Sequence, residues 1–193
     1  MYEIFCTALS LAISTATEFS KKERERVGLA LISKTDELTG LYNRRGYKQL
    51  STQAVSLALQ MDKKGLIVYG DMDGLKKIND TYGHDVGDRA IQAAASIIKS
   101  NFRNSDICAR IGGDEFALTV VDITPSVYTE NLKSIERDCM AWSKAQLLPI
   151  ILSISFGCIE FSQEQSNFDE LLNLADKALY EEKRRKKSLE VVK

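Results

Sequence analysis

Residues 105–121, SDICARIGGDEFALTVV, decide the fold of this chain. Within them, two apolar runs at 106–111 and 116–121 flank the pair Gly112 and Gly113. Two glycines between apolar runs predict a tight hairpin, because the turns that suit one need positive φ angles, which glycine adopts without steric cost. The stretch therefore predicts two antiparallel strands joined at the glycines.

Acidic residues lie at the mouth of this hairpin. Side chains alternate along a strand, so Asp114 and Glu115 are expected to face opposite ways while Phe116 packs inward. One carboxylate then points into a site whose glycine neighbours let a ligand approach the backbone. A second acidic pair, Asp71 and Asp73, ends another apolar run. Acids at strand ends are well placed to meet a ligand at the edge of a sheet.

Composition excludes several classes of protein. The chain has 193 residues, of which 44% are hydrophobic, which is typical of one globular domain with an extra element. Lys and Arg number 26 against 27 Asp and Glu, so no basic footprint for duplex nucleic acid exists. The cysteines show no metal-binding spacing and predict buried thiols in a reducing compartment; they are Cys6, Cys108, Cys139 and Cys158.

The N-terminal residues 1–34 are expected to form a helix separate from a main domain at 35–193. Apolar residues recur at seven-residue steps, but Glu23 and Arg26 interrupt the pattern, so a coiled-coil dimer seam and a helix packed on its own domain both remain open. The apolar part, 4–16, is shorter than the ~20 residues that span a bilayer and lacks a basic leading segment. We therefore expect a cytoplasmic protein without a membrane segment.

The rest of the chain predicts an α+β fold. Periodicity predicts helices at 41–61, 74–82, 90–100, 127–148 and 168–187, with strands at 65–69 and 150–161 besides the hairpin. Asp73 is expected to cap the helix at 74–82, residues 83–85 to form a turn, and Gly157 to mark a bulge or close approach. A hairpin embedded among helices indicates one mainly antiparallel sheet, covered on one side by helices.

Two carboxylates near a lysine suit a divalent cation and a triphosphate. Mg²⁺ takes oxygen ligands, often one or two carboxylates together with substrate phosphates, so Asp71, the Met72 carbonyl and Asp114 would suffice. The alternative is that each acid only caps a helix or lies in a solvated turn.

Several motifs in order carry a strong resemblance to the GGDEF-domain diguanylate cyclases, over residues 36–180. They are DELTGLYNRR at 36–45, DMD at 71–73 with Lys76 and IND at 78–80, GH at 83–84 with GD at 87–88, GGDEF at 112–116, SISFG at 153–157 and ADKALY at 175–180. The family's palm-like fold is similar to that of adenylyl cyclases and polymerases. The resemblance implies that two GTP molecules are joined into cyclic di-GMP, with release of two pyrophosphates, by a homodimer of facing half-sites.

The resemblance also implies roles for individual residues. Asp71, the Met72 carbonyl and Asp114 would hold Mg²⁺ or Mn²⁺, and Glu115 would either assist deprotonation of the 3′-hydroxyl or complete the metal shell. The remaining substrate contacts are assigned as Gly112 and Gly113 against the nucleotide, Asn79 and Asp88 on the guanine edge, and Lys76, Lys183 and Lys187 on the β- and γ-phosphates.

Two further features concern phosphate contact and regulation. The family often ends in Gly-Arg-Asn where this chain has Lys186, Lys187 and Ser188, so the bidentate fork of an arginine is lost and weaker triphosphate contact is expected. Arg103 and Asp106 match the family's R-x-x-D motif, which implies an inhibitory site for the product.

The same residues bear on two alternative functions. A non-catalytic receptor for GTP or cyclic di-GMP is disfavoured by the intact acidic set, and a cyclase making adenine-containing dinucleotides is disfavoured by Asp88.

Overall fold

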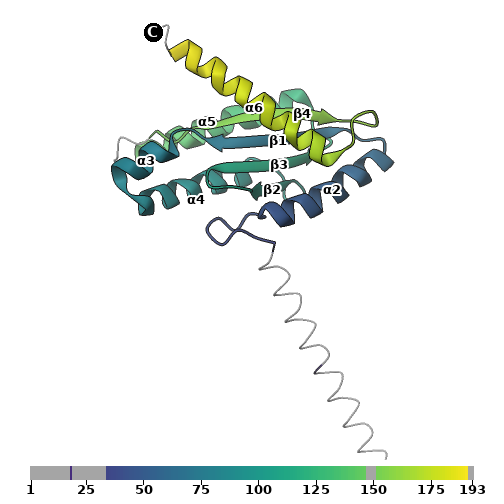
Figure 1. Cartoon of the computed structure of the whole chain (residues 1–193), viewed down its shortest axis with the longest axis horizontal. Helices are drawn as coiled ribbons and strands as arrows, with labels where there is room; N and C mark the ends of the chain where they lie inside the picture. The colour runs from purple at the N-terminus through teal and green to yellow at the C-terminus, as the bar shows by residue number, and fades with distance from the viewer. Residues whose placement is uncertain (1–17, 19–33, 147–150, 191–193) are drawn as a thin grey trace, which may run out of the picture. The chain divides into compact units, whose positions relative to one another are not determined.

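The main unit of the chain is built on a four-stranded antiparallel sheet (Figure 1). The structure is a computed structural model that describes residue 18 and residues 34–146 and 151–190, with side chains to residue 188. The chain divides after Lys34 into two units, and the description concerns the one that begins at Thr35. The predicted N-terminal helix at 1–34 lies outside the described residues, Glu18 and Lys34 apart.

The strand order is β2-β3-β1-β4, and every neighbouring pair is antiparallel. The α+β class and the antiparallel sheet are therefore confirmed. The strands are β1 (Gly65–Met72), β2 (Ile107–Arg110), β3 (Glu115–Val121) and β4 (Ile154–Phe161). The helices are α2 (Arg44–Gln60), α3 (Leu75–Tyr82), α4 (His84–Ser100), α5 (Pro125–Ala145) and α6 (Phe168–Glu190).

Helices cover both faces of this sheet, so the expectation of cover on one side is wrong (Figure 1). Val68 and Phe116 on one face pack in a core with α3, α4 and α5, whereas Ile67 and Ala117 on the other pack with α2 and α6. The central strand β1 is buried on both faces, which its continuous apolar run allows. The predicted inward packing of Phe116 is confirmed, since it is fully buried.

Local chemistry sets the helix boundaries near the site. The N-cap of α2 is Asn43, whose side chain accepts a hydrogen bond from the Gly46 amide at 2.9 Å. The N-cap of α3 is Gly74 at φ 73°, without a side-chain cap, so the predicted capping by Asp73 is wrong. Gly83 at φ 86° alone separates α3 from α4, and helix begins at His84 where a turn was predicted.

Two expectations about the ends of elements are only partly tested. The predicted helix end at 148 and strand start at 150 lie outside the described residues, and β4 begins at Ile154. No helix in the described ranges has the length and apolar character needed to cross a membrane. The three described cysteines are free thiols; Cys108 and Cys139 are buried as predicted, whereas Cys158 is only partly buried.

Candidate active site

The acidic residues of the two motifs meet at one end of the sheet. β1 and β3 are paired so that Asp71 lies opposite Glu115, and the Met72 amide donates a hydrogen bond to the Asp114 carbonyl at 3.0 Å. The two strand ends that were expected to be neighbours are therefore adjacent. This register places Asp114 close enough to Asp71 for its charge to raise the pKa of Asp71.

Asp71 lies in an environment that disfavours its negative charge. Burial is the largest effect and raises the pKa of Asp71, and the charges of Asp114 and Asp73 raise it further. The Lys183 ammonium, which contacts Asp71 Oδ1 and opposes the shift, leaves the pKa above its ordinary value. A site that concentrates carboxylates beyond what one lysine neutralises favours a cation.

The donors here suit a hard divalent cation that brings other ligands with it. Within the described residues no three His, Cys, Asp or Glu side chains form a metal-binding group. The protein's share is limited to two carboxylates and a backbone carbonyl, which is the small share that Mg²⁺ takes when substrate phosphates and water complete its shell. The residues therefore fit a cation that arrives with a phosphorylated substrate.

Asp73, just beyond β1, is held by hydroxyl groups and a lysine. Its carboxylate accepts hydrogen bonds from Ser153 Oγ at 2.7 Å and Ser155 Oγ at 2.8 Å. The Lys186 Nζ lies 3.7 Å from Asp73 Oδ2 and donates to Ser155 Oγ at 2.9 Å. These contacts bind the segment before β4 and the end of α6 to the end of β1.

The link between β2 and β3 differs from the predicted turn. It spans four residues, closed by a hydrogen bond of 2.9 Å from the Ile111 amide to the Glu115 carbonyl, and neither glycine has a positive φ. Gly112 instead makes room for the Glu115 carboxylate, because a Cβ at Gly112 would lie 2.1 Å from Glu115 Oε2. A Cβ on Gly113 would meet nothing within 4 Å, so this side of the turn is open.

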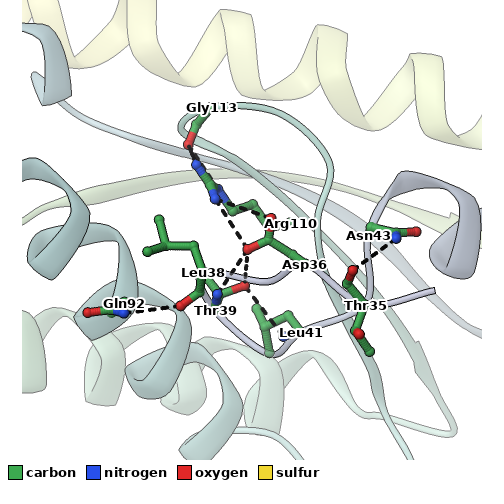
Figure 2. A network of polar contacts seen from close by, with 9 residues as sticks. All are labelled: Thr35, Asp36, Leu38, Thr39, Leu41, Asn43, Gln92, Arg110 and Gly113. Carbon is green, nitrogen blue, oxygen red and sulfur yellow. Dashed lines mark hydrogen bonds and ion pairs between the residues drawn. The ribbon is translucent and has the colours of Figure 1, made fainter. Parts of the chain in front are cut away.

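A network of polar contacts through Arg110 and Asp36 holds the link between β2 and β3 (Figure 2). The Arg110 guanidinium donates to the Gly113 carbonyl at 2.8 Å and to both Asp36 carboxylate oxygens at 3.2 Å. Asp36 also accepts from the Thr39 amide at 3.0 Å and hydroxyl at 2.6 Å. Asp36 therefore positions the guanidinium that holds the turn.

The two residues expected on the guanine edge come together at α3 and α4. Asn79 Oδ1 is buried and has no hydrogen-bond partner among the described residues. The missing side chain of Gly87 makes room for it, since a Cβ there would lie 1.8 Å from Asn79 Oδ1. Asp88 is exposed on the next residue of α4. An unpaired buried acceptor beside an exposed carboxylate is suited to a ligand that offers hydrogen-bond donors.

A cavity of about 820 Å³ lies beside the acidic residues, between α3, the segment before β4 and α6. Its lining includes Lys183 and Lys187, which were predicted to contact phosphates, and also Lys77 and Lys186, which sequence reasoning did not assign. The available signal was the spacing 183, 186, 187, which places three lysines on one helix face. The lining does not include Lys76, and Lys183 is the residue that joins the cavity to Asp71.

The cavity does not reach every residue expected to bind substrate. Asn79, Asp88 and Asp114 are outside its lining. The structure thus groups the expected residues in three places: acids at the strand ends, polar groups on α3 and α4, and lysines around the cavity.

Arg103 and Asp106 lie together in the turn before β2. The Asp106 amide donates to the Arg103 carbonyl at 3.0 Å, and Asp106 Oδ2 accepts from the Arg103 amide at 2.8 Å. Asp106 is buried, which raises its pKa against the lowering effect of that backbone hydrogen bond. The Arg103 side chain is exposed. The carboxylate therefore fixes a turn that presents the arginine to solvent.

Comparison with known proteins identifies similar chains. The profile of the family described as "Diguanylate cyclase, GGDEF domain" matches residues 33–188. The probable diguanylate cyclase DgcC of Escherichia coli K12 is 32% identical over 176 residues, which cover 90% of this chain and 46% of DgcC. Diguanylate cyclase DosC of the same strain is 32% identical over 172 residues, covering 86% of this chain and 35% of DosC.

A solved structure agrees with these relatives. The coiled coil and GGDEF domain of DgcB from Caulobacter crescentus, in complex with c-di-GMP, superposes with a TM-score of 0.80 and 26% identity. The match covers 91% of this chain and 94% of that one. The chain spans less than half the length of the two curated relatives, so it corresponds to one part of each.

Proposed function

Since the chain belongs to the GGDEF-domain diguanylate cyclase family, we propose that it condenses two GTP molecules into cyclic di-GMP and releases two pyrophosphates. The observation that carries this proposal is the meeting of Asp71 and Asp114 at adjacent strand ends, with Lys183 beside them. This set offers oxygen ligands for a cation and an ammonium group for phosphate within one site.

The metal of the proposed reaction is Mg²⁺ or Mn²⁺, held by Asp71, the Met72 carbonyl and Asp114. Such an ion would supply Lewis acidity at the α-phosphate and a template for in-line attack by a 3′-hydroxyl. Glu115 is our candidate for accepting the hydroxyl proton or for completing the charge around the ion. Its carboxylate is held against Gly112 and lies 4.0 Å from an Arg44 nitrogen.

The substrate contacts follow from the other two groups of residues. Asn79 Oδ1 needs a donor and Asp88 is free to accept one, which suits the N1 and N2 hydrogens of guanine and excludes adenine. Gly113 leaves space for the nucleotide against the turn. Lys183, Lys187 and Lys76 are proposed to bind the β- and γ-phosphates, with Lys187 as the single charge that replaces an arginine fork.

The proposed catalyst is a homodimer. One unit offers one set of guanine and phosphate contacts, whereas the product joins two guanosines, so two units must face each other. Residues 1–34 are our candidate for aligning them, as a domain distinct from 35–193, and the cytoplasm is the proposed location.

Product feedback is proposed at Arg103 and Asp106. The buried Asp106 holds the turn in place, and the exposed guanidinium can form a fork with a phosphate or a guanine edge. Arg103→Ala should continue to form product after the wild-type enzyme has slowed. If both proteins stall at the same product concentration, the site is not regulatory.

The central test is incubation of the purified protein with Mg²⁺ and either GTP or ATP, followed by identification of products by mass. We expect cyclic di-GMP from GTP only, with a rate per protomer that rises with protein concentration. Asp114→Asn should abolish it. A wild-type protein that binds GTP but forms no product at any concentration would be a receptor, and an adenine-containing product would assign a different cyclase.

A further inference from the structure

We propose that Lys186 is a phosphate-binding residue that determines affinity for the terminal phosphates of the substrate, an inference that rests on the proposed function. Neither the acidic site nor the departure from the family's Gly-Arg-Asn assigns Lys186 a role. Its position in the structure supplies one.

The cavity is lined by an excess of positive charge. Four lysines line it, and Asp73 is the one acidic side chain in the lining. Apolar and hydroxyl groups make up the rest, from residues that include Ile78, Ile151 and Ser153. This excess of positive charge in a concave surface attracts a multiply charged anion. Lys183 lines the cavity and also contacts Asp71 of the proposed metal site, so the anion that the cavity would bind is the polyphosphate of the nucleotide.

Helix α6 carries three lysines on the face that lines the cavity. Lys183, Lys186 and Lys187 are three and four residues apart, so they share one helix face, where like charges repel. Lys183 is compensated by Asp71 and Lys186 by the more distant Asp73, while Lys187 has no acidic partner in the described part of the chain. The contact of Lys186 is the loose one, because its ion pair spans 3.7 Å and its side chain is 43% exposed.

Lys186 can exchange its present hydrogen-bond partner for a phosphate oxygen. Its hydrogen bond to Ser155 Oγ is to a neutral hydroxyl. A phosphate oxygen is a stronger acceptor for an ammonium group than a hydroxyl is. Asp73 would keep both of its serine donors when Lys186 leaves, so the exchange strands no buried carboxylate. The flexible lysine side chain can therefore turn from Ser155 to the ligand at little cost.

The test is a ligand series measured by calorimetry on wild type, Lys186→Ala and Lys186→Arg, with GMP, GDP and a non-reactive GTP analogue in Mg²⁺. We expect Lys186→Ala to weaken the GTP analogue about fivefold and GMP less than twofold, and Lys186→Arg to restore affinity. The loss should shrink at higher salt, since the contact is partly exposed. The matched control is Lys177→Ala, which removes an exposed lysine of α6 outside the cavity.

Two results would overturn the inference. Equal weakening of all three ligands would mean that Lys186 only supports the fold through Ser155 and Asp73. No weakening beyond that of Lys177→Ala would mean that the terminal phosphates lie elsewhere. Failure of the proposed function is seen separately, as absence of cyclic di-GMP from the wild-type protein.

Discussion

Substituting Gly157 tests how α6 is placed on the sheet. Gly157 lies in β4 opposite Tyr69, and α6 crosses directly over it. A Cβ at this position would lie 2.1 Å from the Leu179 amide nitrogen and 2.5 Å from the Ala175 carbonyl oxygen. Ordinary contact begins at 3.4 Å, so α6 must retreat by about 1.3 Å. Both atoms belong to backbone, so no side-chain rotation relieves the clash.

The loss of stability in Gly157→Ala comes from the gap that the displaced helix leaves above the sheet. Leu171, Ala175 and Leu179 are buried between α6 and the sheet, and a gap of an ångström removes a large part of their dispersion contacts. Overpacking usually costs about 1–3 kcal/mol, and the rigid backbone places this case near or above the upper value. We expect the free energy of unfolding in urea to fall by about 3 kcal/mol with an unchanged m-value.

Gly113→Ala is the matched control for stability. A Cβ at Gly113 meets nothing within 4 Å and its φ is not positive, so its free energy of unfolding should stay within about 0.5 kcal/mol of wild type. Gly157→Ala should also lose cyclase activity under conditions where it is folded, because Lys183 is carried on the displaced helix. A Gly157→Ala protein as stable as the control would refute this account of the packing.

Three other substitutions test the chemistry of single groups. Asp36→Asn should lower the free energy of unfolding by about 1–2 kcal/mol at pH 7. Burial raises the Asp36 pKa, but hydrogen bonds from Thr39 and Arg110 outweigh it and leave the pKa below its ordinary value. Urea titrations should therefore show the difference from wild type constant above about pH 4 and vanishing as pH falls through the folded pKa. Asp71→Asn should slow product formation about a hundredfold or more. It should also raise the free energy of unfolding at pH 7 by less than about 1 kcal/mol, because burial and the charges of Asp114 and Asp73 together raise the Asp71 pKa more than Lys183 lowers it. A difference from wild type that does not change with pH would contradict this. Tyr47→Phe should lower the free energy of unfolding by about 1–2 kcal/mol in the same titration, because the buried Tyr47 hydroxyl donates a hydrogen bond to the Leu118 carbonyl at 3.1 Å. An unchanged stability would mean that water satisfies the Leu118 carbonyl in the variant.

The sequence predicted the acidic site well because strand periodicity and short connections are local information. Asp71 ends one apolar run and Asp114 comes just before another, and an antiparallel pairing brings the end of one strand beside the start of its neighbour. What the local pattern could not show was the second layer of contacts. The Arg110 guanidinium reaches Asp36 across 74 positions of sequence, and no spacing rule connects those two residues.

Two glycines have roles that the local pattern did not predict. Gly87 lies inside α4, where a Cβ would be 1.8 Å from the buried Asn79 Oδ1. Gly112 was assigned a positive φ, yet its missing side chain admits the Glu115 carboxylate instead. In both places tertiary contact, which the sequence does not display, decided the use of glycine.

The acids at the end of β1 are paired with lysines of α6. Asp71 and Asp73 are two residues apart at the end of β1, and Lys183 and Lys186 are three apart on α6. A strand repeats every two residues and a helix about every three or four, so the two elements present their charges in matching pairs. The helix thereby neutralises the strand end, and Lys187, next along the same face, keeps a charge that no described acid cancels. Lys187 can therefore bind a phosphate without first breaking an ion pair.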